Sequence, residues 1–237
     1  MAIPAIPSYE IPTGPFPDRV NWTIEAHRAA LLVHDMQRYF LDAYQLDRQP
    51  MSVALPNMVR IREACERAGI PVVYTAQPGD QHPSRRGILA DFWGKGLESG
   101  RDQEIVPQLA PRDGDITVTK WRYSGFQRTD LRHLLGHHGR DQLIVVGVYA
   151  HMGCMLSAIE AFMSDVAPFF VIDAVGDFSR EEHEMAGTYI GKRAGRVLTT
   201  DRVVEALATE WSVSEAENAE QSATEPTAPE RTVNECR

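Results

Sequence analysis

The feature that most constrains the fold of this chain is the alternation of short apolar segments with segments of helical spacing. The apolar segments, which we expect to be strands, are Ala29–His34, Ile70–Thr75, Ile116–Thr119, Gln142–Tyr149, Phe169–Ala174 and Val197–Thr199. The expected helices are Val53–Ala68, Thr129–His138, Gly153–Ser164, Arg180–Arg193 and Arg202–Trp211. Such alternation indicates a parallel sheet joined by right-handed crossovers and covered by helices on both faces. The sequence therefore predicts the α/β class with a three-layer α/β/α architecture.

Ionisable and glycine-rich residues stand where three of the predicted strands end. Asp35 follows the first strand, Lys120 follows the third, and the fourth ends in the glycine-containing run Gly147–Cys154. Parallel α/β sheets collect their ligand-binding groups at the carboxyl ends of the strands. We therefore expect an enzyme in which an acid, a cation and a glycine gap converge on one pocket.

The bulk composition excludes several classes of protein. A net charge of -9 argues against nonspecific binding to nucleic acid or to an anionic membrane surface. No apolar run approaches the roughly 20 residues of a membrane helix, and the N-terminus lacks the pattern of a signal peptide. The 3 cysteines are scattered and odd in number, which argues against a disulfide framework. We expect a cytoplasmic protein that binds neither nucleic acid nor membrane.

The domain organisation follows from a change in composition near Trp211. Residues 1–211 carry the strand and helix pattern, and 43% of the whole chain is hydrophobic, enough for one sizeable core. Residues 212–237 are rich in Glu, Ala, Ser, Thr and Pro, and such a segment cannot offset its ordering entropy by burial. We expect an acidic disordered tail, inert rather than a docking segment. Within the domain, the long irregular stretch Gln77–Pro111 favours a functional lid.

Five ordered blocks of this sequence resemble the isochorismatase family. They are Val33–Phe40, Tyr74–Pro78, Asp91–Gly94, Lys120–Ser124 and Gly147–Met155. The resemblance implies a Rossmann-like sheet of six parallel strands in the order 3-2-1-4-5-6. It also implies an isochorismatase-like hydrolase domain that cleaves isochorismate to 2,3-dihydro-2,3-dihydroxybenzoate and pyruvate in a siderophore or related pathway. Members of the family are usually homodimers or higher homo-oligomers that use neither a metal nor an organic cofactor.

The chemistry of the reaction gives Asp35 its expected role. Hydrolysis of an enolpyruvyl vinyl ether begins when an acid protonates the methylene carbon, and water then attacks the oxocarbenium ion. Burial raises the pKa of an aspartic acid, and a nearby lysine such as Lys120 lowers it, so the sequence leaves the balance open. Substrate carboxylates that offset the charge of Lys120 are one way to protonate Asp35. The alternative role for Asp35 is a strand-end carboxylate that caps the next helix.

Other residues receive roles from the resemblance. Lys120 binds a substrate carboxylate and stabilises the shift of charge, unless it is a solvated lysine at a strand end. Gln77 and Arg86 contact polar groups of the substrate, and Trp93 and Tyr149 line the pocket. Arg86 is preferred to its neighbour because the family has an Arg-Gly pair at this point. Trp93 has an alternative reading as a core residue under the loop.

Gly153 occupies the position at which related cysteine hydrolases, such as nicotinamidases, carry their nucleophile. Cys154 comes one residue later, about 100° further around a helix, so its sulfur is expected to point away from the pocket. A glycine suits acid-catalysed cleavage because that reaction needs space for water and no covalent intermediate. We therefore expect catalysis by Asp35, Lys120 and Gly153, with Cys154 buried.

Metal binding is not expected. His133 and His137 are four residues apart on a predicted helix, a spacing that can bind zinc, but with His138 they fit a solvated face better. Three functions stay open: isochorismate hydrolysis, with 2-amino-2-deoxyisochorismate as the alternative substrate; a thiol amidohydrolase that uses Cys154; and a non-catalytic partner in a biosynthetic assembly. Many siderophore-pathway relatives continue into an aryl carrier domain, and we expect no carrier activity from the short tail.

Overall fold

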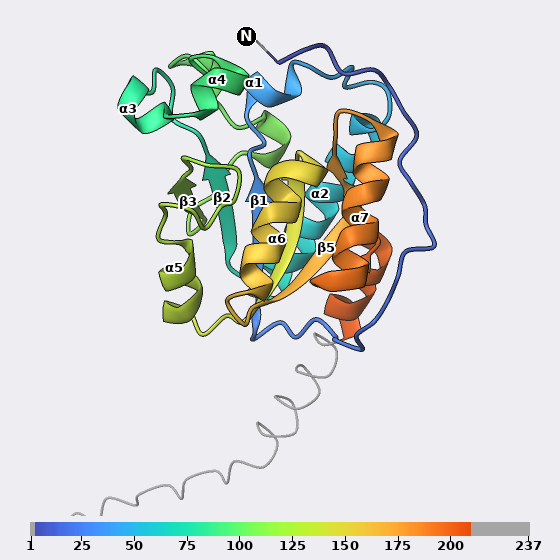
Figure 1. Cartoon of the computed structure of the whole chain (residues 1–237). Helices are drawn as coiled ribbons and strands as arrows, with labels where there is room; N and C mark the ends of the chain where they lie inside the picture. Colours follow the sequence, from blue (N-terminus) through green and yellow to red (C-terminus); the bar gives the residue numbers. More distant parts are fainter. Residues whose placement is uncertain (1–2, 210–237) are drawn as a thin grey trace, which may run out of the picture.

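A six-stranded parallel sheet forms the centre of the computed structural model, which describes residues 3–209 (Figure 1). The strands are β1 (Ala29–His34), β2 (Val72–Ala76), β3 (Ile116–Thr119), β4 (Gln142–Val148), β5 (Ala167–Gly176) and β6 (Arg196–Leu198). Their order is β3-β2-β1-β4-β5-β6, and every neighbouring pair is parallel. The predicted class and strand order are confirmed.

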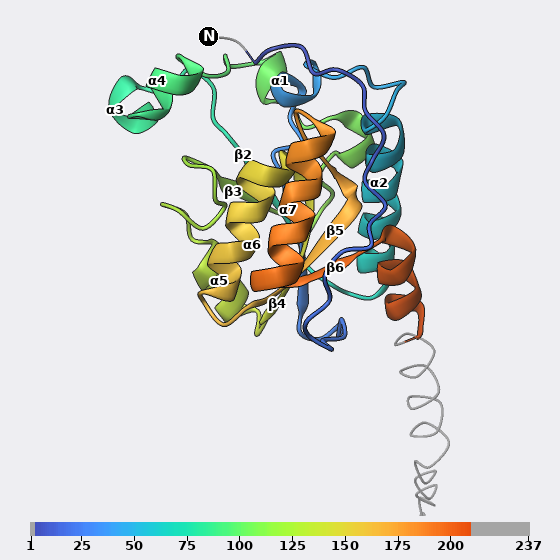
Figure 2. The same cartoon turned by 45° about the vertical axis from the view of Figure 1, so that its right-hand side comes forward.

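Helices cover both faces of this sheet, as Figures 1 and 2 show from two sides. The longer ones are α2 (Met51–Arg67), α5 (Leu131–His137), α6 (Met155–Phe162) and α7 (Arg180–Arg193). Helix α2 and the helical residues 200–209 lie on one face, and α5, α6 and α7 lie on the other. None of the helices in residues 3–209 is long and apolar enough to span a lipid bilayer.

Strand β1 shows why the sheet needs two helical layers. All six of its residues are buried, and the side chains of successive residues point to opposite faces. Leu31 and Val33 join the apolar cluster under α2, whereas Ala30 and Leu32 join the cluster under α5, α6 and α7. A fully buried leucine side chain contributes roughly 1.5–3 kcal/mol. Both faces of the central strand are therefore core.

The strand order reverses beside β1, and this reversal positions the functional site. β1 pairs with β2 on one side and with β4 on the other, so His34 lies in register with Thr75 and with Gly147. On the next pair, Ala76 of β2 is in register with Thr119 of β3. The residues that follow β1, β3 and β4 therefore meet at one edge of the sheet, where parallel α/β proteins bind ligands.

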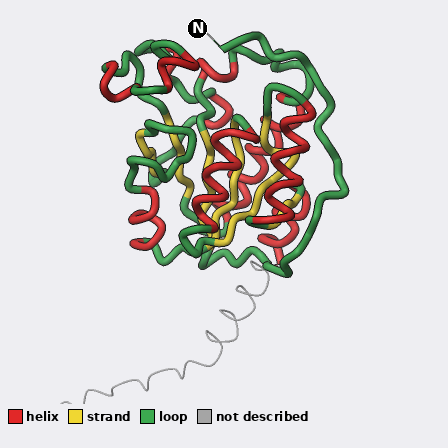
Figure 3. The backbone as a smooth tube through the Cα atoms, viewed as in Figure 1, coloured by secondary structure: helices red, strands yellow, loops and turns green. Residues whose placement is uncertain are grey.

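The segment that we predicted to be an irregular lid, Gln77–Pro111, contains short helices. They are α3 (Pro83–Arg86), α4 (Leu89–Trp93), η1 (Arg101–Gln103) and η2 (Pro107–Leu109). With α1 (Arg38–Leu41), α3 and α4 stand at the carboxyl end of the sheet, away from the helical layers (Figure 3). The predicted tail lies outside the described residues.

One predicted element differs in type. We expected an α-helix to begin at Gly153, but Ala150–Cys154 form a π-helical turn, η3, and the α-helix α6 begins at Met155. Because a π-helical turn packs an extra residue into the turn, it shifts the directions of Gly153 and Cys154. Such turns are frequent at functional sites.

Candidate active site

A pocket opens at the carboxyl ends of β1, β3 and β4, under the lid helices. It contains about 550 Å³ of space, including its opening to solvent. Polar and aromatic side chains dominate its wall: His34, Asp35, Tyr39, Gln77, Arg86, Trp93, Lys120, Arg122, Tyr123, Tyr149 and Phe178, together with Gly153. All seven residues that the sequence pointed to as catalytic or substrate-binding line this one pocket.

Asp35 and Lys120 form a buried ion pair in the pocket wall. The Nζ atom of Lys120 lies 2.9 Å from Oδ2 of Asp35, and both side chains are at most 5% exposed. The same Nζ donates a hydrogen bond of 2.6 Å to the carbonyl of Arg122. Asp35 has a φ angle of 50°, which is uncommon for a residue other than glycine. Backbone strain of this kind clusters at functional sites.

The protonation of Asp35 is decided by opposing effects. Burial raises the pKa of this carboxyl, but the charge of Lys120, the neighbouring His34 and a 2.7 Å hydrogen bond from Oγ1 of Thr75 outweigh burial and hold the pKa below its usual value. These contacts favour the charged form of Asp35 in the pocket. Asp35 is a carboxylate there at neutral pH.

Gln77 connects the acid to the lid. Its Nε2 donates to Oδ2 of Asp35 at 3.3 Å, and its Oε1 accepts a hydrogen bond of 3.2 Å from Nη1 of Arg86. Arg86 is 5% exposed, whereas the guanidinium of Arg85 lies over the ring of Trp121, 5.6 Å from its centroid. Of the two adjacent arginines, Arg86 is the one that lines the pocket.

Aromatic side chains from three elements form the opposite wall. Tyr149 stacks on Phe178 with ring centroids 4.2 Å apart, and Trp93 also stacks on Phe178, with centroids 6.0 Å apart. Nε1 of Trp93 donates a hydrogen bond of 2.7 Å to Oη of Tyr123. Trp93 therefore joins α4 to the residues after β3 and β5, and it faces the pocket as well as the base of the lid.

The pocket contains two arginines that have no acidic partner among residues 3–209. Arg86 donates to the carbonyl of Gly94 and to Gln77, and Arg122 donates to the carbonyls of Arg85 and Trp121. Since Lys120 is balanced by Asp35, these two guanidiniums leave the pocket with a surplus of positive charge. Arginine binds carboxylates with paired hydrogen bonds, so the arrangement suits an anionic ligand.

Gly153 lines the pocket, and Cys154 does not. The thiol of Cys154 is fully buried in the apolar cluster under α5, α6 and α7. Burial raises the pKa of Cys154 well above its usual value, which suppresses the reactive thiolate. The cysteine therefore lacks both the access and the ionisation that a nucleophile needs.

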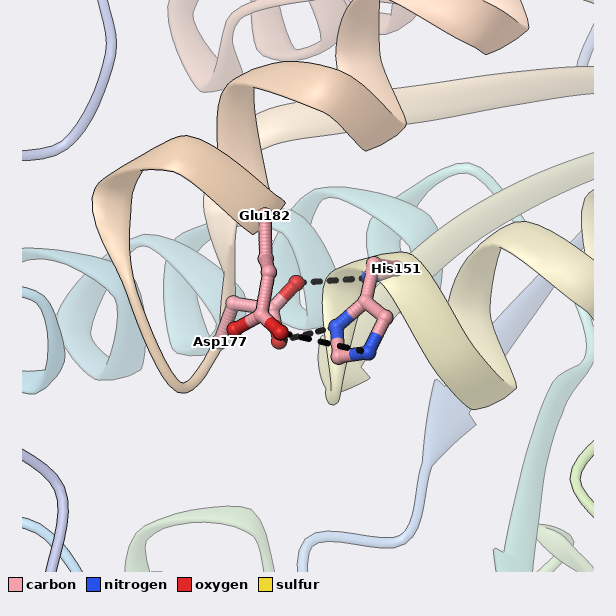
Figure 4. Close-up of side chains that lie close together, drawn as sticks. All are labelled: His151, Asp177 and Glu182. Atoms are coloured by element: carbon pink, nitrogen blue, oxygen red, sulfur yellow. Dashed lines mark hydrogen bonds and ion pairs between the residues drawn. The ribbon is translucent and has the colours of Figure 1, made fainter.

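A second ionisable cluster lies beside the pocket and joins His151, Asp177 and Glu182 (Figure 4). Asp177 accepts hydrogen bonds of 2.6 Å from the backbone N–H of His151 and of 2.9 Å from that of Phe178, and its Oδ1 lies 2.6 Å from Nδ1 of His151. Glu182, in the first turn of α7, is 3.9 Å from Nε2 of His151.

These donor types can bind a metal ion, and within residues 3–209 no other group of three such side chains is close enough to do so. The oxygens of Asp177 are already engaged, so the cluster acts as an internal brace. The histidines of α5 that we weighed as a zinc pair are not part of it.

Several site residues were not singled out from the sequence. Thr75 donates to Asp35, and the fully buried Gln37 donates from Nε2 to the carbonyls of Gln77 and Gln103, near the two ends of the lid. His34 and Arg122 also line the pocket. Each stands inside a sequence block that was recognised, so its position at a strand end was the available signal.

Comparison with known proteins identifies the family of this chain. The model of the isochorismatase domain family matches residues 29–202. The chain is 49% identical over 210 residues to the isochorismatase of Bacillus subtilis strain 168, covering 87% of this chain and 67% of that protein. It is 44% identical to enterobactin synthase component B of Escherichia coli K12 (87% and 73%), and 48% identical to the phenazine biosynthesis protein PhzD of Pseudomonas fluorescens (85% and 98%).

Solved structures share the fold at lower identity. A cysteine hydrolase from Pseudomonas syringae pv. phaseolicola 1448A superposes with a TM-score of 0.75 at 23% identity, covering 84% of this chain and 99% of that one. This likeness concerns the fold alone. The family match and the identities above 40% go further: the chain is a hydrolase that belongs to the isochorismatase family.

Proposed function

We propose that this protein hydrolyses isochorismate to 2,3-dihydro-2,3-dihydroxybenzoate and pyruvate. The observation that carries the proposal is the pair of Asp35 and Lys120 in a pocket whose described lining residues include two arginines without an acidic partner and no cysteine. Relatives at 44–49% identity that are named isochorismatase and enterobactin synthase component B support the same reaction.

The charges of the pocket fit a substrate with two carboxylates. Arg86, Lys120 and Arg122 supply three positive charges, and Asp35 supplies one negative charge. Isochorismate carries a ring carboxylate and an enolpyruvyl carboxylate, so its two charges match the surplus. Arg86 and Arg122 lie on the lid side, whereas Lys120 is next to the acid. We assign the enolpyruvyl carboxylate to the neighbourhood of Lys120, because this places the methylene carbon near Asp35.

In this mechanism Asp35 is the general acid. Its proton is transferred to the methylene carbon, and the ether oxygen stabilises the resulting cation as an oxocarbenium ion. Water adds to the cationic carbon, and the carboxylate of Asp35 takes up the proton that water releases. Collapse of the hemiketal breaks the bond between the ring oxygen and the former enolpyruvyl carbon. The hemiketal hydroxyl becomes the keto group of pyruvate, and its proton passes to the ring oxygen, which becomes the ring hydroxyl. No covalent bond to the protein is formed.

For this mechanism, substrate binding has to raise the pKa of Asp35 so that the carboxylate takes up a proton. An aspartic acid with an ordinary pKa of ~3.9 is protonated in only about one molecule in 10³ at pH 7. In this pocket the pKa is lower still, because Lys120 and His34 outweigh burial. A substrate carboxylate beside Lys120 offsets the lysine charge, and burial then raises the pKa of Asp35. Binding of the dianionic substrate therefore favours the protonated form of Asp35 that the reaction needs.

The assay is the release of pyruvate from isochorismate and, separately, from 2-amino-2-deoxyisochorismate. We expect kcat/KM to be higher for isochorismate. A preference for the amino analogue would assign the protein to the second substrate, in line with its 48% identity to PhzD. Turnover of neither compound would contradict the proposal and favour a non-catalytic partner.

A further inference from the structure

The imidazole of His34 fills the space that a side chain at position 153 would need. A Cβ atom added to Gly153 would lie 2.0 Å from Cε1 and 2.6 Å from Nε2 of His34. Carbon atoms in favourable contact are about 3.5–4.0 Å apart. Any side chain at position 153 therefore overlaps the ring unless the ring moves.

The ring of His34 is held in place. Its Nδ1 is 2.7 Å from the carbonyl oxygen of Val148, and its Nε2 is 3.1 Å from that of Tyr123. The residue is 1% exposed, and the backbone of His34 is packed against Gly147, where an added Cβ would lie 2.2 Å from the carbonyl oxygen of His34. A displaced ring would give up both of these contacts and would have to move into the pocket that it lines.

Position 153 is one of two places at which the turn Ala150–Cys154 reaches the pocket, and the other is Met152. Gly153 lines the pocket beside Asp35 and Lys120, whereas the next residue, Cys154, is buried in the core. Of these two positions, 153 is the one at which related cysteine hydrolases carry their nucleophile. His34 occupies that volume.

We propose that His34 is a specificity-determining residue that excludes a nucleophilic side chain at position 153 and so commits the pocket to acid chemistry at Asp35. The commitment to acid chemistry at Asp35 rests on the proposed function. The exclusion of a side chain at position 153 is a steric claim, and it can be tested without any assay of isochorismate. His34 and Gly153 form one unit, although they are more than a hundred residues apart in sequence.

The test is a double-mutant cycle that compares wild type, Gly153→Ala, His34→Ala and the double variant. In the wild-type background we expect Gly153→Ala to lower Tm by roughly 3–10 °C, because overpacking a closed site is destabilising. In the His34→Ala background, the same Gly153→Ala substitution should change Tm by only a small part of that amount. If the His34→Ala protein does not fold, His34→Val takes its place in the same cycle.

A second measurement detects the opened space directly. The His34→Ala/Gly153→Cys protein is treated with iodoacetamide under native conditions, and the adducts are located by peptide mapping. Residue 153 should be alkylated, whereas Cys154 in the same molecule should stay unmodified because it is buried.

Three results would overturn the proposal. They are a Gly153→Ala protein with the Tm and activity of wild type, an equal loss of Tm in both backgrounds, and a folded double variant whose cysteine at position 153 resists alkylation. If the coupling is found but wild type does not release pyruvate, the steric claim stands and the proposed function fails.

Discussion

Asp35 and Asp177 are two buried carboxylates of the same sheet that have different surroundings. Both follow a strand, Asp35 after β1 and Asp177 after β5, and both are in ion-pair contact with a basic nitrogen, at 2.9 Å and 2.6 Å. Asp35 is partnered by Lys120 and lines a pocket. Asp177 is partnered by His151, accepts two backbone N–H groups and faces no comparable space within the described part of the chain.

The difference teaches that a buried acid beside a cation does not by itself make an active site. A buried acid can act on a substrate when a cavity lies against it and when nearby positive charges, here those of Arg86 and Arg122, have no acidic partner and can bind the substrate. Where backbone and side-chain donors saturate the carboxylate, the same pairing becomes a brace. For Asp177 the brace holds Phe178, whose ring stacks on Tyr149 in the pocket wall.

Among variants of the residues around the two carboxylates, the largest effect is expected from Lys120, and it would sharpen this comparison. Lys120→Met removes the charge that holds down the pKa of Asp35, so burial should raise that pKa. We expect kcat to fall by about 10²–10³, as for loss of an electrostatic stabiliser. The profile of kcat/KM against pH should also change.

In wild type, kcat/KM should fall as pH rises, because the free enzyme, in which Asp35 is a carboxylate, has to take up a proton before the reaction. In Lys120→Met the fall should begin at a higher pH. His151→Gln is the matched control, and its profile should follow wild type. Coincident profiles for Lys120→Met and wild type would contradict the account.

Asp177→Asn should separate stability from catalysis. The variant weakens the hydrogen bonds of a buried carboxylate, so we expect the free energy of unfolding to fall by about 1–3 kcal/mol. Differential scanning calorimetry should show a lower Tm. The value of kcat/KM, measured well below Tm, should change by less than about tenfold (1.4 kcal/mol). A loss of activity as large as that of Lys120→Met, with Tm unchanged, would make Asp177 catalytic.

The unpaired arginines should act on binding. Arg86→Lys and Arg122→Lys keep a positive charge but lose the planar donors, and we expect each to raise KM about tenfold, the equivalent of ~1.4 kcal/mol. Steady-state kinetics with isochorismate provides the measurement. Arg85→Lys is the control, because Arg85 lies over Trp121 and should leave KM unchanged. If Arg85→Lys were as harmful as Arg86→Lys, the assignment of Arg86 would be wrong.

The smallest effect concerns His151 and the pH dependence of stability. Burial lowers the pKa of this histidine, but its hydrogen bond to Asp177 and the charges of Asp177 and Glu182 raise it above its usual value. The stabilisation is then fully present below the unfolded pKa of ~6.5 and is lost as pH rises through the folded pKa.

We expect wild type to exceed His151→Gln in stability by on the order of 1 kcal/mol at pH 6, with a smaller difference at pH 9. Urea unfolding at both pH values measures it. A difference that grows with pH would show that the sign is wrong.

Much of the site could be predicted because parallel strands bring their carboxyl ends together. Asp35 and Lys120 are 85 positions apart, yet a strand end precedes each, and the structure pairs them at 2.9 Å. Helix α7 was predicted with its observed bounds, and in the structure Ser179 caps its N-terminus while Lys192 and Arg193 stand in its last turn. These signals are local or follow from the strand pattern.

Other features depend on tertiary contacts that a sequence does not display. The π-helical turn at Ala150–Cys154 has no periodicity of its own and lies in contact with β4, α6 and α7. Ile3 and Tyr9 belong to an N-terminal segment without regular structure, yet Ile3 lines the pocket and Tyr9 accepts a hydrogen bond from the backbone of Asp177. The contact of His34 with position 153 depends on the register of β1 with β4.

The most direct test of the central claim is the initial rate of pyruvate release by Asp35→Asn and Cys154→Ala, measured side by side with wild type on isochorismate. We predict that Asp35→Asn loses about 10²–10⁴ in kcat, the usual contribution of a general acid, while Cys154→Ala keeps the wild-type rate. Folding of both variants is checked by circular dichroism. An active Asp35→Asn protein, or a folded but inactive Cys154→Ala protein, would contradict this claim.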